Sequence, residues 1–426
     1  MNQSTNQLVE HFFRHESAKL IAVLTRAFGI RRIDLIEDMV QVAMMEAMNS
    51  WKLNGVPPNP SAWIHIATKN RIIDSLRREK AFEKAMVLSG QTLASQELVI
   101  DHWLEDEHIS DSLLRMIFVC CHPLNDRKSQ VALTLKTLCG FGISEIARGL
   151  LLPNETVKKR IQRAKKTLAE SKVSLDLPTG EQLYQRLDVV HDVLYLMFNE
   201  GYSTSCGIDP IRSDICEEAA RLCHLLCQSS CSSPSTKSLL ALMLFHASRI
   251  DARTDDQGAV ILLEDQCRYS WDRHLIESAQ GWLAQSKTGQ PTTYHLEATI
   301  AMLHCIAPSI EKTDWSGISI LYGQLLEIHD SPMYAFNQAI AIGEMGDTHE
   351  ALTRLKQLKG NPALKGYFLL ECAIARIYRL QGDTKNAIDS YLVARSLTAV
   401  IHEQDFVEHK IRSISDSTKD SATQSE

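Results

Sequence analysis

The sequence predicts an all-α protein with two small helical domains followed by a long helical-repeat domain. Apolar residues recur at helical spacing over most of the 426 residues, and no stretch alternates as a strand would. Glycine and proline are sparse and cluster at breaks between helical stretches, as in Gly55–Pro60 and Leu177–Gly180. A Gly-Asp turn also returns at a regular interval near the C-terminus, which is typical of stacked helical hairpins.

The composition is that of a well-packed globular protein, with 44% hydrophobic and 23% charged residues. No apolar run reaches the roughly 20 residues of a membrane helix, and the N-terminus lacks a signal-peptide pattern, so we expect a cytoplasmic protein without a membrane partner. The formal net charge of −7 argues against nucleic-acid binding, but residues 1–170 carry +4 and residues 171–426 carry −11. The basic half is therefore the candidate for nucleic-acid binding.

Residues 142–168 predict two short helices around a tight turn. In the second helix, Val157, Ile161, Ala164 and Leu168 form one apolar stripe. Asn154 is expected to cap this helix through its side-chain oxygen. Cations occupy the rest of the circumference: Lys158, Lys159, Arg160, Arg163, Lys165 and Lys166. Such a helix suits the DNA major groove, so the stretch predicts a DNA-reading helix-turn-helix.

A helix at residues 35–48 is expected to have one apolar and one acidic face. Met39, Val42, Ala43 and Ala47 form the predicted inner face. On or near the opposite face lie the acidic and polar residues Asp34, Glu37, Asp38 and Gln41. Taken alone, this face is that of an ordinary solvated helix with acids at its favoured end.

A third helix, at residues 61–78, follows a proline-rich loop. Ile66, Ile73 and Leu76 are expected to face inward. Trp63 is either a core residue, which is the commoner role, or a platform on which an unpaired base stacks. The outer face is left to Lys69, Asn70, Arg77 and Arg78. Together with the helix-turn-helix, this cationic face suggests two separate contacts along one DNA.

The C-terminal part contains a repeat. Gly346-Asp-Thr348 and Gly382-Asp-Thr384 lie 36 residues apart, and Asp314 precedes Asp347 by 33 residues. This spacing resembles the tetratricopeptide repeat, a stack of helical hairpins with a concave binding surface. The alternative is an unrelated helical bundle with similar turns.

The 11 cysteines raise the question of a metal or redox site. Cys216, Cys223, Cys227 and Cys231 cluster around His224, but on a helix they would span about 22 Å, too far for one tetrahedral ion. We expect them to be small core residues, and we expect no metal site and no cofactor.

These stretches resemble a known family. LIEDMVQ at 35–41 and AWIHIATKNRIIDSLRR at 62–78 resemble region 2 of bacterial RNA polymerase sigma factors of the extracytoplasmic-function (ECF) type. The chain is also similar to region 4 of these factors, at residues 114–123, 145–148 and 160–165. It further resembles the ECF subgroup with a tetratricopeptide-like C-terminal extension, at residues 195–202, 240–246, 313–315 and 331–341.

The resemblance implies a role for each matching residue. It implies that the clamp helices of the polymerase β′ subunit are bound by Asp34, Glu37, Asp38 and Gln41. It implies that the −10 element is read and melted by Trp63, Lys69, Asn70, Asp74, Arg77 and Arg78. The loop Asn54–Pro60 corresponds to the segment that traps a flipped base. Reading of the −35 element falls to Glu155, Lys158, Lys159, Arg160, Gln162 and Arg163.

We therefore expect a promoter-specificity subunit without catalytic residues, whose partners are promoter DNA and the β′ and β subunits of core RNA polymerase. The later cations of the recognition helix, such as Lys165, are expected to grip phosphates. The acidic extension is expected to act in cis as a regulatory or assembly domain, and its repeats offer a surface for a protein or peptide partner. The expected organisation is region 2 at 8–85, a linker at 86–109, region 4 at 110–172, a helical extension at 180–290, repeats at 291–412 and a flexible tail at 413–426.

Two other classes of protein stay open. One is a repeat-scaffold DNA-binding regulator that works without core polymerase. The other is an enzyme whose site lies in the extension and uses residues such as Asn199 and Glu200, but no metal-ligand spacing, phosphate loop or nucleophile motif supports it.

Overall fold

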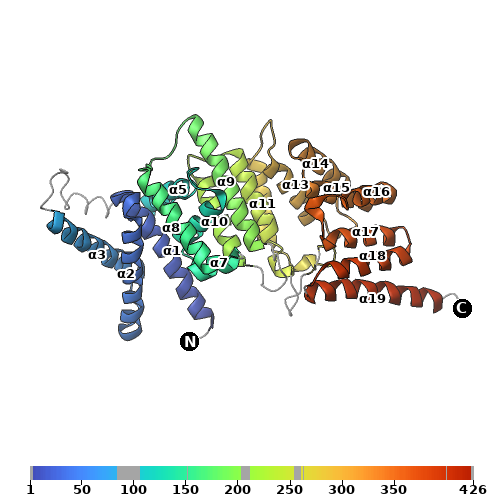
Figure 1. Ribbon diagram of the computed structural model, residues 1–426, viewed down its shortest axis with the longest axis horizontal. Coiled ribbons are helices and arrows are strands. Elements are labelled where there is room, and N and C mark those ends of the chain that lie inside the picture. Colours follow the sequence, from blue (N-terminus) through green and yellow to red (C-terminus); the bar gives the residue numbers. More distant parts are fainter. Residues whose placement is uncertain are drawn as a thin grey trace. The chain divides into compact units, whose positions relative to one another are not determined.

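A computed structural model (Figure 1) describes residues 3–83, 106–150, 152–202, 212–253, 261, 263–399 and 401–423. Helices dominate and no strand occurs among these residues, which confirms the predicted all-α fold class. The chain divides into two compact units: unit 1 holds Met1–Glu200 and Arg221–Ser232, and unit 2 holds Gly201–Ala220 and Ser233–Glu426. The expected linker at 86–109 lies outside the described residues as far as residue 105.

Unit 1 contains the basic half of the chain and continues through most of the helix that follows it. Its elements are α1 (Gln3–Phe28), η1 (Ile30–Arg32), α2 (Ile33–Asn54), α3 (Pro60–Glu83), α5 (Asp106–Cys120), α6 (Arg127–Thr137), α7 (Ile143–Gly149), α8 (Asn154–Glu170), most of α9 (Glu181–Tyr202) and the last turns of α10 (Ser213–Gln228). Helix α1 packs against α2 and α5, and α8 packs against α6, α7 and η1.

The core of unit 1 is formed by the apolar stripes of these helices. On α1, Leu20, Val23 and Leu24 are fully buried, and on α5 Ile117 and Phe118 are buried as well. Burying each such side chain contributes roughly 1.5–3 kcal/mol. The stripe of α1 therefore holds the N-terminal helices and α5 in one body.

Unit 2 is a series of helices in which neighbours along the chain pack together (Figure 1). Its elements, after the first turns of α10, are α11 (Pro234–Ala247), η2 (Ile250–Ala252), η3 (Arg268–Ser270), α12 (Arg273–Gln285), α13 (Thr293–Ile306), α14 (Trp315–Ile328), α15 (Pro332–Glu344), α16 (Thr348–Leu358), η4 (Pro362–Leu364), α17 (Phe368–Leu380), α18 (Thr384–Leu397) and α19 (Ile401–Thr423). Helix α19 continues to Thr423, through the stretch where a flexible tail is expected.

The repeated turn of unit 2 is a helix start. Three aspartates accept a hydrogen bond from a backbone N–H three residues ahead and so cap α14, α16 and α18: Asp314 at 2.9 Å, Asp347 at 3.1 Å and Asp383 at 3.1 Å. Gly346 and Gly382 precede two of these caps with φ of 101° and 77°, which other residues rarely adopt. The spacing noted in the sequence therefore marks equivalent positions of successive helical hairpins.

Gly343 of α15 leaves no room for a side chain. A Cβ atom on Gly343 would clash with the side chain of Ile377 and lie 3.2 Å from Cβ of Ala351. Phe336, Leu355 and Ile374 fill the surrounding core. The glycine therefore lets Ile377 of α17 pack directly on the backbone of α15.

None of the described helices combines the length and apolar character needed to cross a membrane.

Candidate nucleic-acid interface

Helix α8 has the predicted buried stripe. Val157, Ile161, Ala164 and Leu168 are all nearly inaccessible to solvent, and they face α6 and α7. The first helix of the pair, α7, begins at Ile143, where the carboxylate of Glu145 accepts a hydrogen bond from the Gly142 N–H at 2.6 Å. The predicted helix-turn-helix is thus confirmed in its two helices and in the packing between them.

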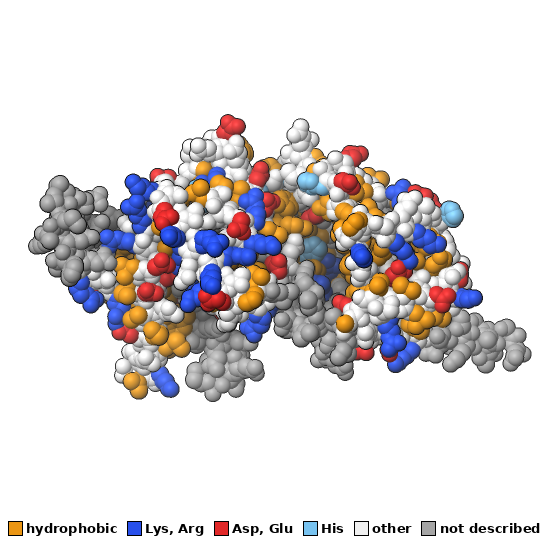
Figure 2. Space-filling model, viewed as in Figure 1, with side chains coloured by type: hydrophobic (Ala, Val, Ile, Leu, Met, Phe, Trp, Pro, Cys, Tyr) orange, Lys and Arg blue, Asp and Glu red, His pale blue; other side chains and the backbone are white. Residues whose placement is uncertain are grey.

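The outer face of α8 presents the residues expected to read the −35 element. Glu155, Lys158, Lys159, Gln162 and Arg163 are exposed, and Glu155 pairs with Lys159 at 3.5 Å. Figure 2 shows Lys and Arg side chains concentrated on this face of unit 1. These polar groups are free to exchange water for a nucleic-acid partner at little desolvation cost.

Arg160 differs from its neighbours because it is half-buried. One terminal guanidinium nitrogen, Nη1, is buried and has no hydrogen-bond partner among the described residues. Asn154 also departs from expectation: Pro153 is the residue before the first helical turn, and no side chain caps α8. The predicted Asn154 cap is therefore wrong, because the helix begins one residue earlier than the capping pattern requires.

Lys165 contradicts its predicted role as a phosphate contact. Its side chain is only 8% exposed, and its ammonium group donates to Glu37 at 2.6 Å and to Asp34 at 3.0 Å. Burial lowers the pKa of Lys165, but the charges of Glu37 and Asp34 outweigh burial and raise it. Lys165 therefore stays charged and joins α8 to the start of α2 instead of facing DNA.

The acidic face of α2 is only partly open to solvent. Asp34, Asp38 and Gln41 are exposed, whereas Glu37 is 14% exposed and also accepts a hydrogen bond from Thr137 at 3.4 Å. The inner face is built from Ile33, Ile36, Val40, Ala43, Met44 and Ala47. Met39 and Val42, expected inside, are half-buried because the stripe runs through Val40 and Met44.

Helix α3 exposes most of the residues expected at the −10 element. Asn70, Asp74, Arg77 and Arg78 are exposed and Lys69 is half-buried. Asp74 pairs with Arg77 at 3.5 Å, and its backbone carbonyl accepts from Arg78 at 3.3 Å. These four neighbouring groups form one polar face along the helix.

The inner stripe of α3 is not the one that the sequence suggested. Ile64, Thr68 and Ile72 are buried, as is Ile73, whereas Ile66 is 56% exposed. Ile66 was expected inside, but it lies off the stripe that Ile64 begins at steps of four residues. The side chain of Leu76 lies outside the described residues.

Trp63 belongs to an aromatic cluster at the start of α3. Its ring contacts Trp51 edge to face at 5.9 Å, and Trp51 in turn stacks on Phe13 at 5.5 Å. Trp63 remains half-buried, so its ring is held by packing and keeps one exposed part. In the loop before it, Asn59 accepts a hydrogen bond from the Ala62 N–H at 3.0 Å and so caps α3.

Further apolar side chains of the α2–α3 region are exposed, and no separate prediction covered them. They are Met45, Met48 and Leu53 on α2 and Val56 in the loop that follows it. The three α2 residues lie off the buried stripe of that helix, so helical periodicity could have marked them as surface residues.

Partly buried polar contacts hold α1 to α3 and α7. Glu16 accepts from His65 of α3 at 2.8 Å and from Lys19 at 2.7 Å. Burial raises the pKa of Glu16, but the hydrogen bonds from His65 and Lys19 outweigh it and lower the pKa to about 2. Arg14 pairs with Glu145 of α7 at 2.6 Å. Helix α1 therefore contacts both α3 and α7.

The clustered cysteines are core residues, as predicted. Cys216, Cys223, Cys227 and Cys231 are buried as free thiols. Burial raises the pKa of Cys216 to about 12, so this thiol stays protonated. Among the described residues, no group of three or more His, Cys, Asp or Glu side chains could hold a metal ion.

Two segments with this geometry match known families. Residues 12–82 match sigma-70 region 2, and residues 126–168 match sigma-70 region 4. The chain is a sigma factor of the sigma-70 family. An uncharacterized protein of Rhizobium meliloti (strain 1021) is 35% identical over 358 residues, which is 82% of this chain and 84% of that protein. Residues 186–287 match a family of unknown function, DUF6596, and no solved structure matches the chain.

This sigma factor binds RNA polymerase and promoter DNA, and like its family it is a non-enzymatic transcription regulator. Region 2 comprises the described helices α1–α3, and region 4 comprises α6–α8. The contact of Lys165 with Glu37 and Asp34 therefore joins region 4 directly to region 2 within one unit.

Proposed function

We propose that this sigma factor is of the extracytoplasmic-function type and selects promoters through two helices. The outer face of α8 reads the −35 element, and the polar face of α3 reads and melts the −10 element. Glu155, Lys158 and Gln162 lie early on α8, where side chains of a recognition helix reach base edges. The exposed cations Arg163 and Lys166 lie later and contact phosphates.

The observation that carries this proposal is the division of α8 into two faces. Its apolar stripe is buried against region 4, while the polar residues named for the −35 element are exposed on the same helix. A helix held along one stripe can enter the major groove without unfolding any of its own packing.

For polymerase docking, we propose that the acidic face of α2 binds the β′ clamp helices and that region 4 also contacts the β subunit. Lys165 neutralises Glu37 and reaches Asp34 in the present arrangement. Binding of β′ to these two carboxylates thus requires Lys165 to leave them. Region 2 and region 4 separate as polymerase binds.

The extension acts in cis in this proposal. Residues 171–426 carry a formal charge of −11 against +4 for residues 1–170, so they repel free DNA while the basic half attracts it. We also propose that the repeats regulate holoenzyme assembly by binding a protein or peptide partner.

Run-off transcription with purified core polymerase on a randomised promoter library tests the proposal. Lys158→Ala and Gln162→Ala should each change the preferred −35 sequence, with about 1–3 kcal/mol less discrimination at one position. Lys166→Ala is the matched control, because an exposed phosphate contact should weaken all promoters alike. An unchanged −35 preference in both recognition variants contradicts the assignment of α8.

Two further measurements test the other parts of the proposal. In the first, failure of the full chain to copurify with core polymerase contradicts the docking role of α2. The second compares transcription with and without unit 2. A chain that ends after Ser232 keeps every residue of unit 1, so equal activity with and without unit 2 contradicts regulation in cis.

A further inference from the structure

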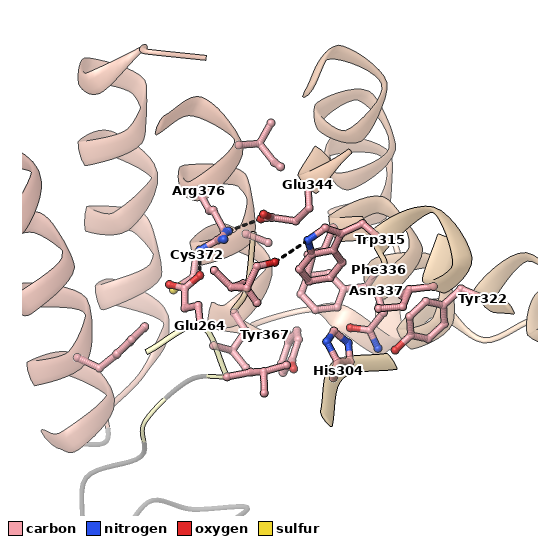
Figure 3. A pocket seen from close by; sticks show the side chains of 18 of the residues that line it. Glu264, His304, Trp315, Tyr322, Phe336, Asn337, Glu344, Tyr367, Cys372 and Arg376 are labelled. Carbon is pink, nitrogen blue, oxygen red and sulfur yellow. Dashed lines mark hydrogen bonds and ion pairs between the residues drawn. The ribbon is translucent and has the colours of Figure 1, made fainter. Parts of the chain in front are cut away.

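Unit 2 contains a cavity of about 340 Å³ that is partly open to solvent (Figure 3). Helices α13, α14, α15, α17, α18 and α19 all contribute lining side chains, together with Leu263 and Glu264. This volume falls within the usual range for a small-molecule site and is too small for a folded partner. The cavity is separate from the DNA-facing helices, which belong to unit 1.

The cavity walls are aromatic and fixed in place. The Trp315 indole N–H donates to the Ile310 carbonyl at 3.1 Å, and the His304 ring packs edge to face on Trp315 at 5.3 Å. Phe336, which lies beside Trp315 in Figure 3, packs edge to face on Tyr367 at 5.7 Å. Rings held in this way present flat surfaces before any ligand arrives, which favours a flat aromatic ligand.

The charges of the lining are neutralised within the chain. Arg376 forms ion pairs with both Glu264 and Glu344, and Lys410 adds a further pair to Glu264 at 2.6 Å. Figure 3 shows Arg376, Glu264 and Glu344 on one side of the cavity and His304, Asn337 and Tyr322 on the other. The charged side chains of the lining are therefore paired with one another or with Lys410, and none of them needs a ligand of opposite charge.

Each side of the cavity also disfavours a charged ligand. Burial raises the pKa of Glu344, so a second negative group beside it is unfavourable. At the opposite side, burial and the charges of Arg249 and Arg268 lower the pKa of His304 to about 3, so a positive group there is unfavourable too.

Hydrogen-bonding capacity nevertheless remains in the lining. The His304 ring lines the cavity, and its Nδ1 atom is buried without a hydrogen-bond partner in the described part of the chain. An unpaired buried polar atom costs about 1–3 kcal/mol, and a ligand that bonds to it after a turn of the ring recovers this cost.

We propose that this cavity binds an uncharged, flat aromatic molecule of one or two rings whose polar substituent hydrogen-bonds to His304. The aromatic walls select the ring system and the internally paired charges exclude ionic ligands. The binding site is independent of promoter recognition.

Three naphthalene derivatives of similar size test the proposal on the full-length chain: 2-naphthol, 2-naphthoate and 2-naphthylmethylammonium. Isothermal titration calorimetry should find 2-naphthol bound at least about ten-fold more tightly than either ion, because burying an unpaired charge is costly. The melting temperature of the chain should rise with 2-naphthol concentration, because the ligand binds only the folded state.

Two variants locate the binding. His304→Phe keeps a ring against Trp315 but removes the polar atom, and it should weaken 2-naphthol about ten-fold. Ala373→Leu fills part of the cavity from α17 and should abolish binding. The matched control is His329→Phe, at an exposed histidine elsewhere in unit 2. The melting temperature without ligand shows that each variant folds.

The possible results decide the proposal. Preference for 2-naphthol, lost in His304→Phe and Ala373→Leu but kept in His329→Phe, supports it. Absence of binding by all three compounds, equal binding of neutral and charged compounds, or full affinity in both cavity variants overturns it.

Discussion

Lys165 in unit 1 and Arg376 in unit 2 are both shielded cations held between two carboxylates, but the carboxylates differ. Glu264 and Glu344, which hold Arg376, lie 18% and 10% exposed inside one unit. Of the partners of Lys165, Glu37 is 14% exposed but Asp34 is 79% exposed, and both belong to the face expected to bind polymerase.

This difference separates a permanent ion pair from an exchangeable one. Breaking the Arg376 centre leaves carboxylates in a place that water and external partners reach poorly. Breaking the Lys165 centre returns Asp34 to water at little cost, and an incoming cation can replace Lys165 on Glu37. The first arrangement stabilises a fold, and the second suits a contact that opens.

The largest expected effect is at the permanent centre. Arg376→Met should destabilise unit 2 by about 3–5 kcal/mol, because the largely buried Glu344 loses its ion pair with Arg376 and Glu264 keeps only Lys410. Denaturant unfolding followed by far-UV circular dichroism measures this change. Lys365→Met, at an exposed lysine shortly before the same helix, is the control and should stay within about 0.5 kcal/mol of the wild type. Equal stability of the two variants would show that the centre is not structural.

A smaller effect is expected at the exchangeable centre. Lys165→Met should destabilise unit 1 by about 2 kcal/mol, since hydrogen bonds to charged groups contribute about 1.5–3 kcal/mol. It should also raise the affinity for core polymerase, up to about thirty-fold if all of that energy opposes docking. Fluorescence anisotropy with labelled sigma factor measures the affinity.

Two further variants make the Lys165 prediction specific. Lys166→Met removes an exposed lysine from the same turn and should change neither quantity. Lys165→Glu combined with Glu37→Lys restores opposite charges and should recover stability relative to either single change. Lower stability without tighter polymerase binding in Lys165→Met would mean that the contact does not oppose docking.

The smallest effect is a pH dependence that involves neither centre. Burial lowers the pKa of His191 in unit 1 to about 4, and burial with Arg249 and Arg268 lowers the pKa of His304 in unit 2 to about 3. Both folded values lie below the unfolded value of about 6.5, so the unfolded chain takes up more protons as the pH falls. Stability is therefore lost below pH 6.5, by about 1.4 kcal/mol at pH 5.5 for each histidine.

Denaturant unfolding at pH 7.5 and 5.5 checks this prediction. His304→Phe should reduce the pH dependence of unit 2 by about 1.4 kcal/mol between these two pH values, and His191→Phe should do the same in unit 1. A part remains in each unit, because burial also lowers the pKa of His246 in unit 2 and of His122 in unit 1. If the unfolding free energy changes equally with pH in the wild type and in both variants, the acid sensitivity belongs to other groups.

Much of the helical structure of unit 1 could be predicted, because the spacing of apolar residues follows the buried face of each helix. The stripe of α8 from Val157 to Leu168 is an example. Lys165 escaped prediction although it lies four residues after Ile161, at the edge of that stripe. A lysine is usually a surface residue, and the acidic partners of Lys165 lie 128 and 131 residues away in the chain. Pairing over such a distance leaves no local pattern.

The inner face of α3 was misjudged for a similar reason. Thr68 occupies a fully buried position between Ile64 and Ile72, and its hydroxyl hides the stripe from a hydrophobicity pattern. The cavity of unit 2 lay beyond sequence reasoning altogether. Its lining runs from Leu263 to Phe406, so only the packing of several helices assembles it.

Gly343 gives the cavity a dependence on a single missing methyl group. Any side chain there would push against Ile377, which lies one residue after Arg376 on α17 and also lines the cavity. The position of the Ile377 side chain in the cavity wall thus depends on its packing against the Gly343 backbone. A mutational search for altered ligand size should therefore include this backbone contact as well as the aromatic walls.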